Sequence, residues 1–129
     1  MAQQQFLLIL LGVIIIGIAV VIGISIFNDN AVSENRDSVS TDLVSLAVRA
    51  QTYFRRPRTF GGGGNSFVGL TIDKLSSKPS NANGTYSVTS TNASQAVLDG
   101  IGIELGSDGH RISVTLTVFP DSLALIHNN

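Results

Sequence analysis

Few side chains in this sequence could carry out chemistry, and their spacing assembles no familiar reaction centre. The 129 residues include no Cys, which excludes disulfides, Cys zinc sites and thiol catalysis. The two His residues, His110 and His127, lie near a predicted turn and near the end of the sequence, and we expect both to be solvated. Serine is abundant, but no Gly-x-Ser-x-Gly motif accompanies it. We therefore expect no enzyme.

Four acidic residues in the second half could gather in loops and bind calcium. They are Asp99, Glu104, Asp108 and Asp121. A calcium-binding loop of the EF-hand type takes its oxygen ligands from fixed positions within about 12 consecutive residues. The spacing of these four matches no such loop, so we expect neither a metal nor a cofactor.

Two asparagines stand in the Asn-x-Ser/Thr pattern that N-glycosylation requires. Asn83 opens the tripeptide Asn-Gly-Thr, and Asn92 opens Asn-Ala-Ser. The pattern is short and arises by chance, so glycosylation at both positions is a hypothesis. The Asn and Ser content of this region otherwise indicates loops.

Four consecutive glycines, Gly61–Gly64, invite comparison with a phosphate-binding loop. Such a loop needs a preceding strand and a Lys-Ser/Thr pair that opens a following helix. Here a predicted helix precedes the glycines and Asn65-Ser66 follows them. We therefore predict a hinge or a tight loop between helix and sheet. Nearby aromatic residues are predicted to pack the corner between the two, namely Tyr53, Phe54, Phe60 and Phe67.

The composition indicates apolar surface that is committed to lipid or to other copies of the protein. Charged residues make up 13% of the chain and hydrophobic residues 43%, whereas a soluble domain carries about 25% charged residues. The formal net charge of −1 gives no reason to expect a nucleic-acid partner. We expect no small-molecule substrate either.

A long uncharged run occupies the start of the sequence, from Phe6 to Phe27. A helix of these 22 residues rises roughly 33 Å, enough to cross a hydrocarbon core of about 30 Å. A secretory signal peptide normally has a basic start and a shorter apolar core of about 7–15 residues. No Lys or Arg precedes Phe6, so we predict a membrane-spanning helix, with a cleaved signal peptide as the alternative.

The helical pattern continues beyond Asn28 and becomes amphipathic. Neither Pro nor Gly interrupts it before Pro57, which predicts one helix of about 50 residues. Its apolar stripe is predicted to cover a sheet through Val39, Leu43, Leu46, Ala50 and Phe54. Arg55 and Arg56 would complement the negative end of the helix dipole, or contact Glu34 or Asp37 of a neighbouring copy.

The second half of the sequence alternates apolar and polar residues, as strands do. The alternating runs include Tyr86 and Val88, then Ile101, Ile103 and Leu105, and then Ile112, Val114, Leu116 and Val118. Asp108-Gly109 is typical of a hairpin turn, and Pro120-Asp121 leads into a last strand over 122–127. The segment 70–75 is predicted as a further short strand or a turn. We divide the chain into an apolar helix (1–27), its amphipathic continuation (28–56), a Pro/Gly-rich connection (57–66) and an antiparallel sheet (67–129).

This α+β arrangement, an apolar N-terminal helix that continues as an amphipathic helix and precedes a small sheet, resembles the type IV pilin family. At residue level the resemblance rests on Gln3–Leu10 and the apolar run to Phe27. It implies a subunit that waits in the cytoplasmic membrane, is extracted by a filament assembly machinery and polymerises with identical copies on the cell surface. The implied filament core comprises Gln3, Gln4, Gln5, Phe6, Leu10, Gly12, Ile16, Gly17, Ala19, Val20, Gly23 and Phe27.

The sequence departs from the bacterial members of that family in several respects. The glutamate usual at the fifth mature position is replaced by Gln5, a neutral amide. No Pro interrupts the apolar run, and no basic leader precedes it, so we expect either the mature chain or unusual processing. Archaeal pilins and flagellins often lack the glutamate, and Gln before the apolar run resembles their pattern.

Two other functions fit the same pattern. One is a pseudopilin or minor pilin of a secretion system, which would form short stacks. The other is a single-pass membrane-anchored binding domain. The amphipathic continuation past Asn28 argues against a simple anchor, because an anchor needs no such apolar seam.

Overall fold

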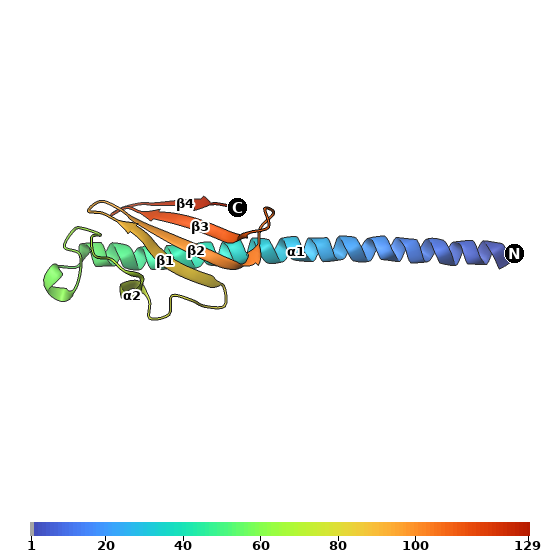
Figure 1. The fold of residues 1–129 in the computed structure, drawn as a ribbon, viewed down its shortest axis with the longest axis horizontal. Coiled ribbons are helices and arrows are strands. Elements are labelled where there is room, and N and C mark those ends of the chain that lie inside the picture. The colour runs from blue at the N-terminus through green and yellow to red at the C-terminus, as the bar shows by residue number, and fades with distance from the viewer. Residues whose placement is uncertain (1) are drawn as a thin grey trace. The chain divides into compact units, whose positions relative to one another are not determined.

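The computed structural model describes residues 2–129 and contains one long N-terminal helix and one antiparallel sheet (Figure 1). The chain divides into two units, the first ending at Ala31 and the second comprising Val32–Asn129. We call residues 2–31 the apolar segment and residues 32–129 the head. Helix α1, Ala2–Arg55, contributes to both. The predicted α+β class and the single long helix are confirmed.

Helix α1 ends where the sequence forbids its continuation. Proline at position 57 has no amide hydrogen and restricts the residue before it, so the helical pattern stops at Arg55. A single 3-10 turn, η1, follows over Arg58–Phe60.

The glycine run closes the end of α1 as a tight loop, the second of the two predicted alternatives. Amides in and just after this run bond to carbonyls at the end of α1 and directly after it: Gly63 donates to Tyr53, Gly64 to Arg56 and Asn65 to Phe54, over 2.7–2.9 Å. A Cβ at Gly63 would lie 1.8 Å from the carbonyl oxygen of Ser66. Only glycine therefore fits at this position.

Four strands form a sheet in which each strand pairs with its neighbour in the chain. They are β1 (Gly84–Thr91), β2 (Ala96–Leu105), β3 (Arg111–Val118) and β4 (Leu123–His127), all antiparallel, in the order β1-β2-β3-β4. Gly109 has a φ of 79°, as expected for the predicted hairpin turn between β2 and β3. The segment 70–75, predicted as a strand or turn, instead contains a short helix, α2, over Ile72–Leu75.

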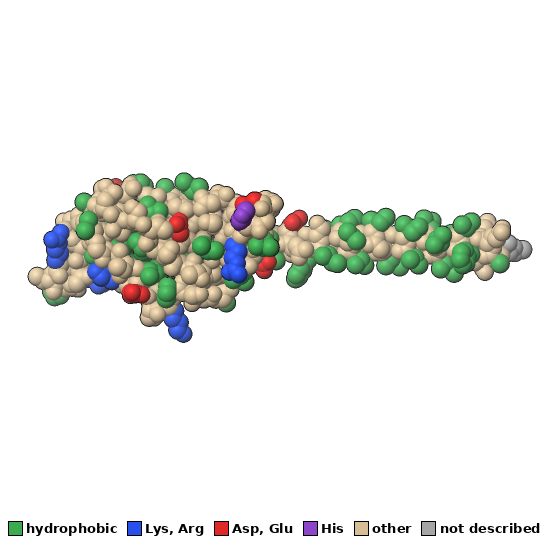
Figure 2. Space-filling model, in the orientation of Figure 1, with side chains coloured by type: hydrophobic (Ala, Val, Ile, Leu, Met, Phe, Trp, Pro, Cys, Tyr) green, Lys and Arg blue, Asp and Glu red, His purple; other side chains and the backbone are tan. Residues whose placement is uncertain are grey.

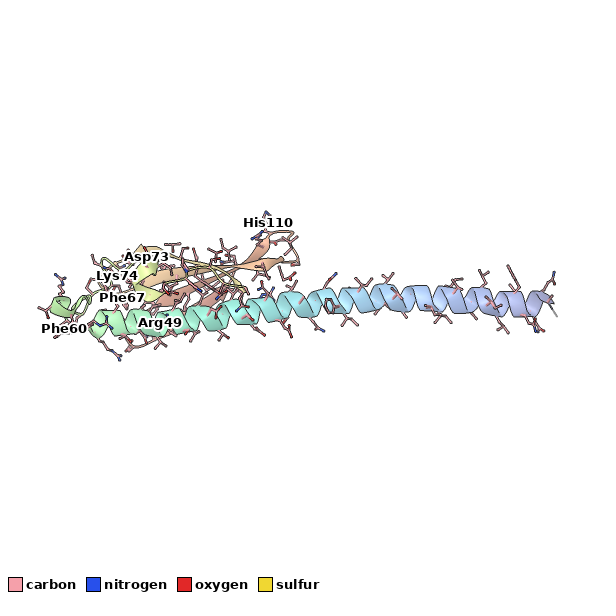
Figure 3. All side chains as sticks on the ribbon, turned by 90° about the horizontal axis from the view of Figure 1, so that it is seen from below. Arg49, Phe60, Phe67, Asp73, Lys74 and His110 are labelled. Atoms are coloured by element: carbon pink, nitrogen blue, oxygen red, sulfur yellow. The ribbon has the colours of Figure 1, made fainter. Side chains whose placement is uncertain are left out.

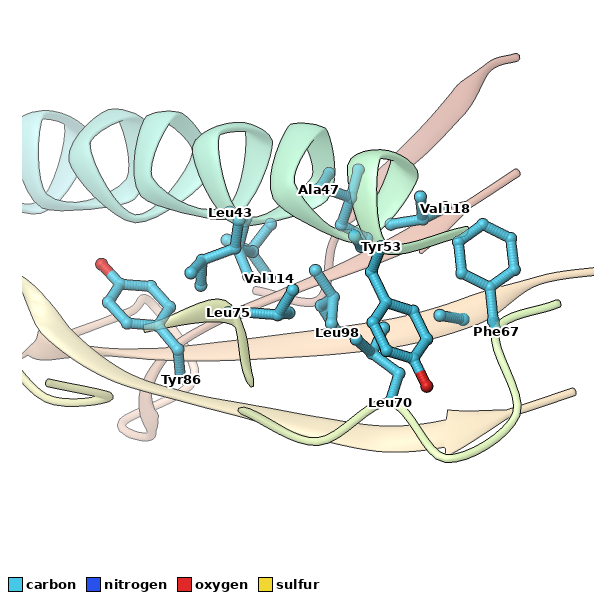
Figure 4. Packing of buried hydrophobic residues seen from close by; sticks show 14 of the residues in the cluster. Leu43, Ala47, Tyr53, Phe67, Leu70, Leu75, Tyr86, Leu98, Val114 and Val118 are labelled. Carbon is cyan, nitrogen blue, oxygen red and sulfur yellow. The ribbon is translucent and has the colours of Figure 1, made fainter. Parts of the chain in front are cut away.

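The core of the head lies between the C-terminal part of α1 and one face of the sheet (Figure 4). Helix α1 contributes a stripe at helical spacing: Val39, Leu43, Leu46, Ala47, Ala50 and Tyr53. Strand β3 contributes every second residue: Ile112, Val114, Leu116 and Val118. The helical spacing of about 3.6 residues gives α1 one apolar face, and the two-residue spacing gives β3 another. These two faces pack together in the core. Phe54, the last of the predicted packing residues, is partly buried against this core.

The predicted aromatic corner forms without Phe60. Phe54 and Phe67 pack with ring centroids 4.7 Å apart, and Phe67 is fully buried. Phe60 is 76% exposed. The prediction for Phe60 is wrong because Pro57 ends α1 and η1 carries the ring beyond the last turn that the sheet covers.

Strand β2 presents its apolar side chains to solvent at one end, contrary to the prediction that the helix covers one apolar face of every strand. Ile101, Ile103 and Leu105 are each about half exposed. The alternate residues, Gly100 and Gly102, face α1 instead. A Cβ at Gly100 would lie 2.7 Å from a methyl carbon of Val39, so the close approach of helix and sheet selects glycine.

Candidate functional site

The apolar segment is the largest surface that the chain leaves without an internal partner. Its large apolar side chains are each between 49% and 72% exposed, from Phe6 to Phe27. Figure 2 shows these side chains on the visible face of the segment. The described residues contain one helix that is long and apolar enough to span a membrane, α1, and its most apolar window is entirely unburied. Exposed apolar surface on this scale marks a site of contact with lipid or protein.

Small residues form a stripe along this segment. Gly12, Ala19 and Gly23 are separated by seven and four residues, which places them within about 40° of one another around a helix of 3.6 residues per turn. Ile16, one turn from Gly12, lies on the same side. A Cβ at Gly12, Gly17 or Gly23 would meet no atom within 4 Å. The fold of the single chain therefore does not require glycine at these positions, whereas close packing of helices in an apolar medium would use it.

The first turn of α1 is polar and uncharged. Gln3, Gln4 and Gln5 are exposed, and the first turn contains no acidic residue. Their amides can donate and accept hydrogen bonds with groups of another molecule. They cannot supply the carboxylate that the pilin resemblance places at the fifth position.

In the head, Asp42 of α1 holds the segment before β1 through a network of hydrogen bonds. Its Oδ2 accepts bonds from the side chains of Asn81, Asn83 and Tyr86. Burial alone would raise the pKa of Asp42, but the three hydrogen bonds outweigh it and lower that pKa. Burial and the hydrogen bond to Asp42 raise the pKa of Tyr86. The network therefore fixes Asp42 as a carboxylate.

The two predicted glycosylation sites differ in accessibility. The side-chain nitrogen of Asn83 is half-buried and donates to Asp42 over 3.1 Å. Asn92 is exposed in the turn between β1 and β2, and among the described residues only the oxygen of its side chain is hydrogen-bonded, to Ser94 and Gln95. Of the two, Asn92 leaves its nitrogen, the atom to which a glycan is attached, accessible.

Of the acidic and histidine side chains that the sequence singled out, only Asp108 and His110 lie close together within the described residues. Within residues 2–129 no group of three or more His, Cys, Asp or Glu side chains could hold a metal ion. Asp99 accepts a hydrogen bond from Thr115, and Asp108 lies 3.7 Å from the ring of His110. His127 is exposed and hydrogen-bonds Ser40 over 3.1 Å.

One buried polar residue escaped the sequence analysis. Asn35 of α1 is 7% exposed, and its side-chain oxygen accepts the amides of Ile103 and Glu104 over 3.0 and 3.2 Å. These amides lie where the pairing of β2 with β3 shifts register. The nitrogen of Asn35 donates to the carbonyl of Asn83. Asn35 therefore satisfies backbone groups that the sheet leaves unpaired.

A groove in the head also escaped the sequence analysis. It has a volume of about 480 Å³ and is lined by Arg49, Thr52, Tyr53, Arg56, Phe60, Gly61 and Lys74. Figure 3 shows Arg49, Phe60 and Lys74 at the same end of the head. The sequence signal was a cluster of cations, for which the sequence suggested the helix dipole or contact with Glu34 or Asp37 of a neighbouring copy, but no groove.

Comparisons of the chain with protein-family models, with curated proteins and with solved structures gave no match.

Proposed function

We propose that this protein is a structural subunit that polymerises through Gln3–Phe27 into an extracellular filament of the type IV pilus kind. The observation that carries the proposal is the apolar segment, which is uncharged over 22 residues and exposed on every side. The subunit resides in the cytoplasmic membrane before an assembly machinery extracts it. Adhesion, motility or cell contact are properties of the assembled filament, and no catalysis is involved.

The physics of the segment supports a transfer from lipid to polymer. Apart from the amides of its first turn, the backbone groups of the apolar segment are bonded within the helix, so α1 can exchange lipid for neighbouring helices without breaking a backbone hydrogen bond. Away from lipid, each large apolar side chain that is buried contributes about 1.5–3 kcal/mol relative to water. A polymer with these side chains in its core is therefore hard to dissociate.

The small-residue stripe supports packing between helices over a simple lipid anchor. Gly12, Ala19 and Gly23 let two backbones approach closely, and a Cβ at Gly12 or Gly23 would meet no atom of the described residues within 4 Å. A lipid anchor has no need of such a stripe. The head adds a surface on which Ser and Thr side chains of β1 and β3 face outward.

The test is electron microscopy of filaments sheared from the native cells, with mass spectrometry of the pelleted material. We expect long thin fibres that contain this chain, and the first residue detected would define its processing. If the chain stays with detergent-solubilised membranes and no fibre contains it, the membrane-anchored binding domain replaces the proposal. Short stacks confined to the cell envelope would instead favour the pseudopilin.

A truncation provides the matched control. Removal of residues 1–28 is expected to give a soluble protein that forms no filaments. If that fragment still polymerised, the apolar segment would not be the core of the assembly.

A further inference from the structure

The charges of this nearly neutral chain are strongly segregated. Six of its eight Lys and Arg residues lie between positions 49 and 78, together with a single acid, Asp73. That segment therefore has a net charge of +5, and the remainder of the chain has −6. The segment forms the end of α1, the glycine loop and α2, and Figure 2 shows several of these cations, in blue, at one end of the head.

The groove of about 480 Å³ lies within this cationic region. Arg49, Arg56 and Lys74 line it, and within residues 2–129 no carboxylate lies within ion-pair distance of any of the three. Asp73, the acid nearest in sequence, does not line the groove. Three cations without counter-charges around one concavity create a positive potential that attracts anions.

Two of these cations are held in place by the fold. Arg49 donates one of its five N–H groups to the carbonyl of Leu75 over 2.8 Å. The ammonium of Lys74 donates to the carbonyl of Gly69 over 2.8 Å and lies 5.3 Å from the ring centre of Tyr53. Arg56 makes no side-chain hydrogen bond within the described residues. The groove therefore presents fixed positive charges that retain free donors.

Phe60 adds an apolar surface to the same groove. Its ring is 76% exposed, the most exposed large apolar side chain of the described residues. It contributes nothing to the core of the head, in contrast to Phe54 and Phe67. An aromatic face beside arginines suits a ligand that has both an apolar face and negative charge.

We infer that this groove binds a short segment of acidic polysaccharide, with Arg56 and Lys74 contacting carboxylates and Phe60 packing against the apolar face of a sugar ring. A volume of about 480 Å³ lies within the range of about 300–1,000 Å³ typical of small-ligand sites. Single-stranded nucleic acid requires a series of aromatic platforms over about 4–16 nucleotides, and only one exposed ring lines the groove. The site lies entirely in the head and does not depend on the proposed polymerisation.

The test measures binding of the full-length chain, in neutral detergent, to polygalacturonate, a polymer of carboxylate-bearing sugars. Arg56→Ala and Phe60→Ala are each expected to weaken binding about fivefold, the size of effect typical of solvent-exposed charge-assisted and aromatic contacts. Arg111→Ala and Ile126→Ala are the matched controls, since both side chains are exposed elsewhere in the head. Each control should change the affinity by less than about twofold.

Several outcomes would overturn the inference. If Arg111→Ala weakened binding as much as Arg56→Ala, the affinity would depend on the overall charge of the chain and not on the groove. Stronger binding of an oligonucleotide than of polygalacturonate would assign the groove to nucleic acid. If Arg56→Ala and Phe60→Ala both bound polygalacturonate as the wild type does, the groove would not be the binding site. If filaments form in the wild type and Arg56→Ala abolishes them, the groove is a contact between copies, and the proposed polymerisation stands independently.

Discussion

The two parts of helix α1 differ in what their apolar side chains contact. In the head, one face of the helix is buried on the sheet and the other carries charged and polar residues, among them Glu34, Asp37 and Arg49. In the apolar segment every large apolar side chain is exposed, whatever its direction. The head thus satisfies its apolar surface within the chain, whereas the apolar segment leaves all of it for other molecules.

Because of this difference, we expect the stability of the head and the proposed assembly to depend on different residues. Substitutions that face the sheet act on the free energy of unfolding of the head. If the proposed function holds, substitutions in the apolar segment should leave the head folded and act on membrane insertion and polymerisation. The following experiments test whether the two parts are separable in this way.

The largest expected effect is that of Ile16→Lys in the apolar segment. A lysine at the centre of a spanning helix costs about 2.5–3.5 kcal/mol on insertion and leaves a charge in the core of any polymer. We expect no filaments on electron microscopy, whereas Ile16→Leu should assemble normally. Near-ultraviolet circular dichroism of the buried Tyr53 and Tyr86 should be unchanged in detergent. Loss of that signal would show that the parts are coupled.

A smaller effect, confined to the head, is expected for Gly100→Val. The new side chain would clash with Val39 and Tyr86, and overpacking of this kind costs about 1–3 kcal/mol. Thermal unfolding of the full chain in detergent should show a Tm lowered by about 10 °C. Ser87→Val, on the exposed side of the neighbouring strand, should change the stability by less than about 0.5 kcal/mol. Equal effects of both variants would contradict the close approach of helix and sheet.

The smallest expected effect is the pH dependence that Asp42 contributes. Because folding lowers the pKa of Asp42, its stabilisation is present above the unfolded value of about 3.9 and is lost as the pH falls through the folded value. We expect Asp42→Ala to destabilise the head by about 1 kcal/mol at pH 7, a value that allows for partial exposure. The difference from the wild type should shrink as the pH falls below about 4. A constant difference at all pH values would exclude titration of this network.

The spacing of apolar residues predicted most of the architecture, because long apolar runs and alternating apolar residues depend directly on which side chains are buried or in contact with apolar surroundings. It could not predict that Gly100 and Gly102 face the helix, since glycines that alternate with Ile101 and Ile103 are assigned to the polar face of a strand. Asn35 was missed for a similar reason, because a polar residue on an amphipathic helix is assigned to solvent unless the unpaired amides of Ile103 and Glu104 are known. The groove joins α1 to α2, and no local pattern relates Arg49 to Lys74.

The order of the sheet has a consequence for how the chain reaches its folded state. Every strand pairs with the strand that precedes or follows it in sequence, so each hairpin can form as soon as its residues are available. The strand pairings of this sheet are therefore local in sequence, which favours their rapid formation. No strand has to be inserted between two others, and the sheet can therefore be completed one hairpin at a time.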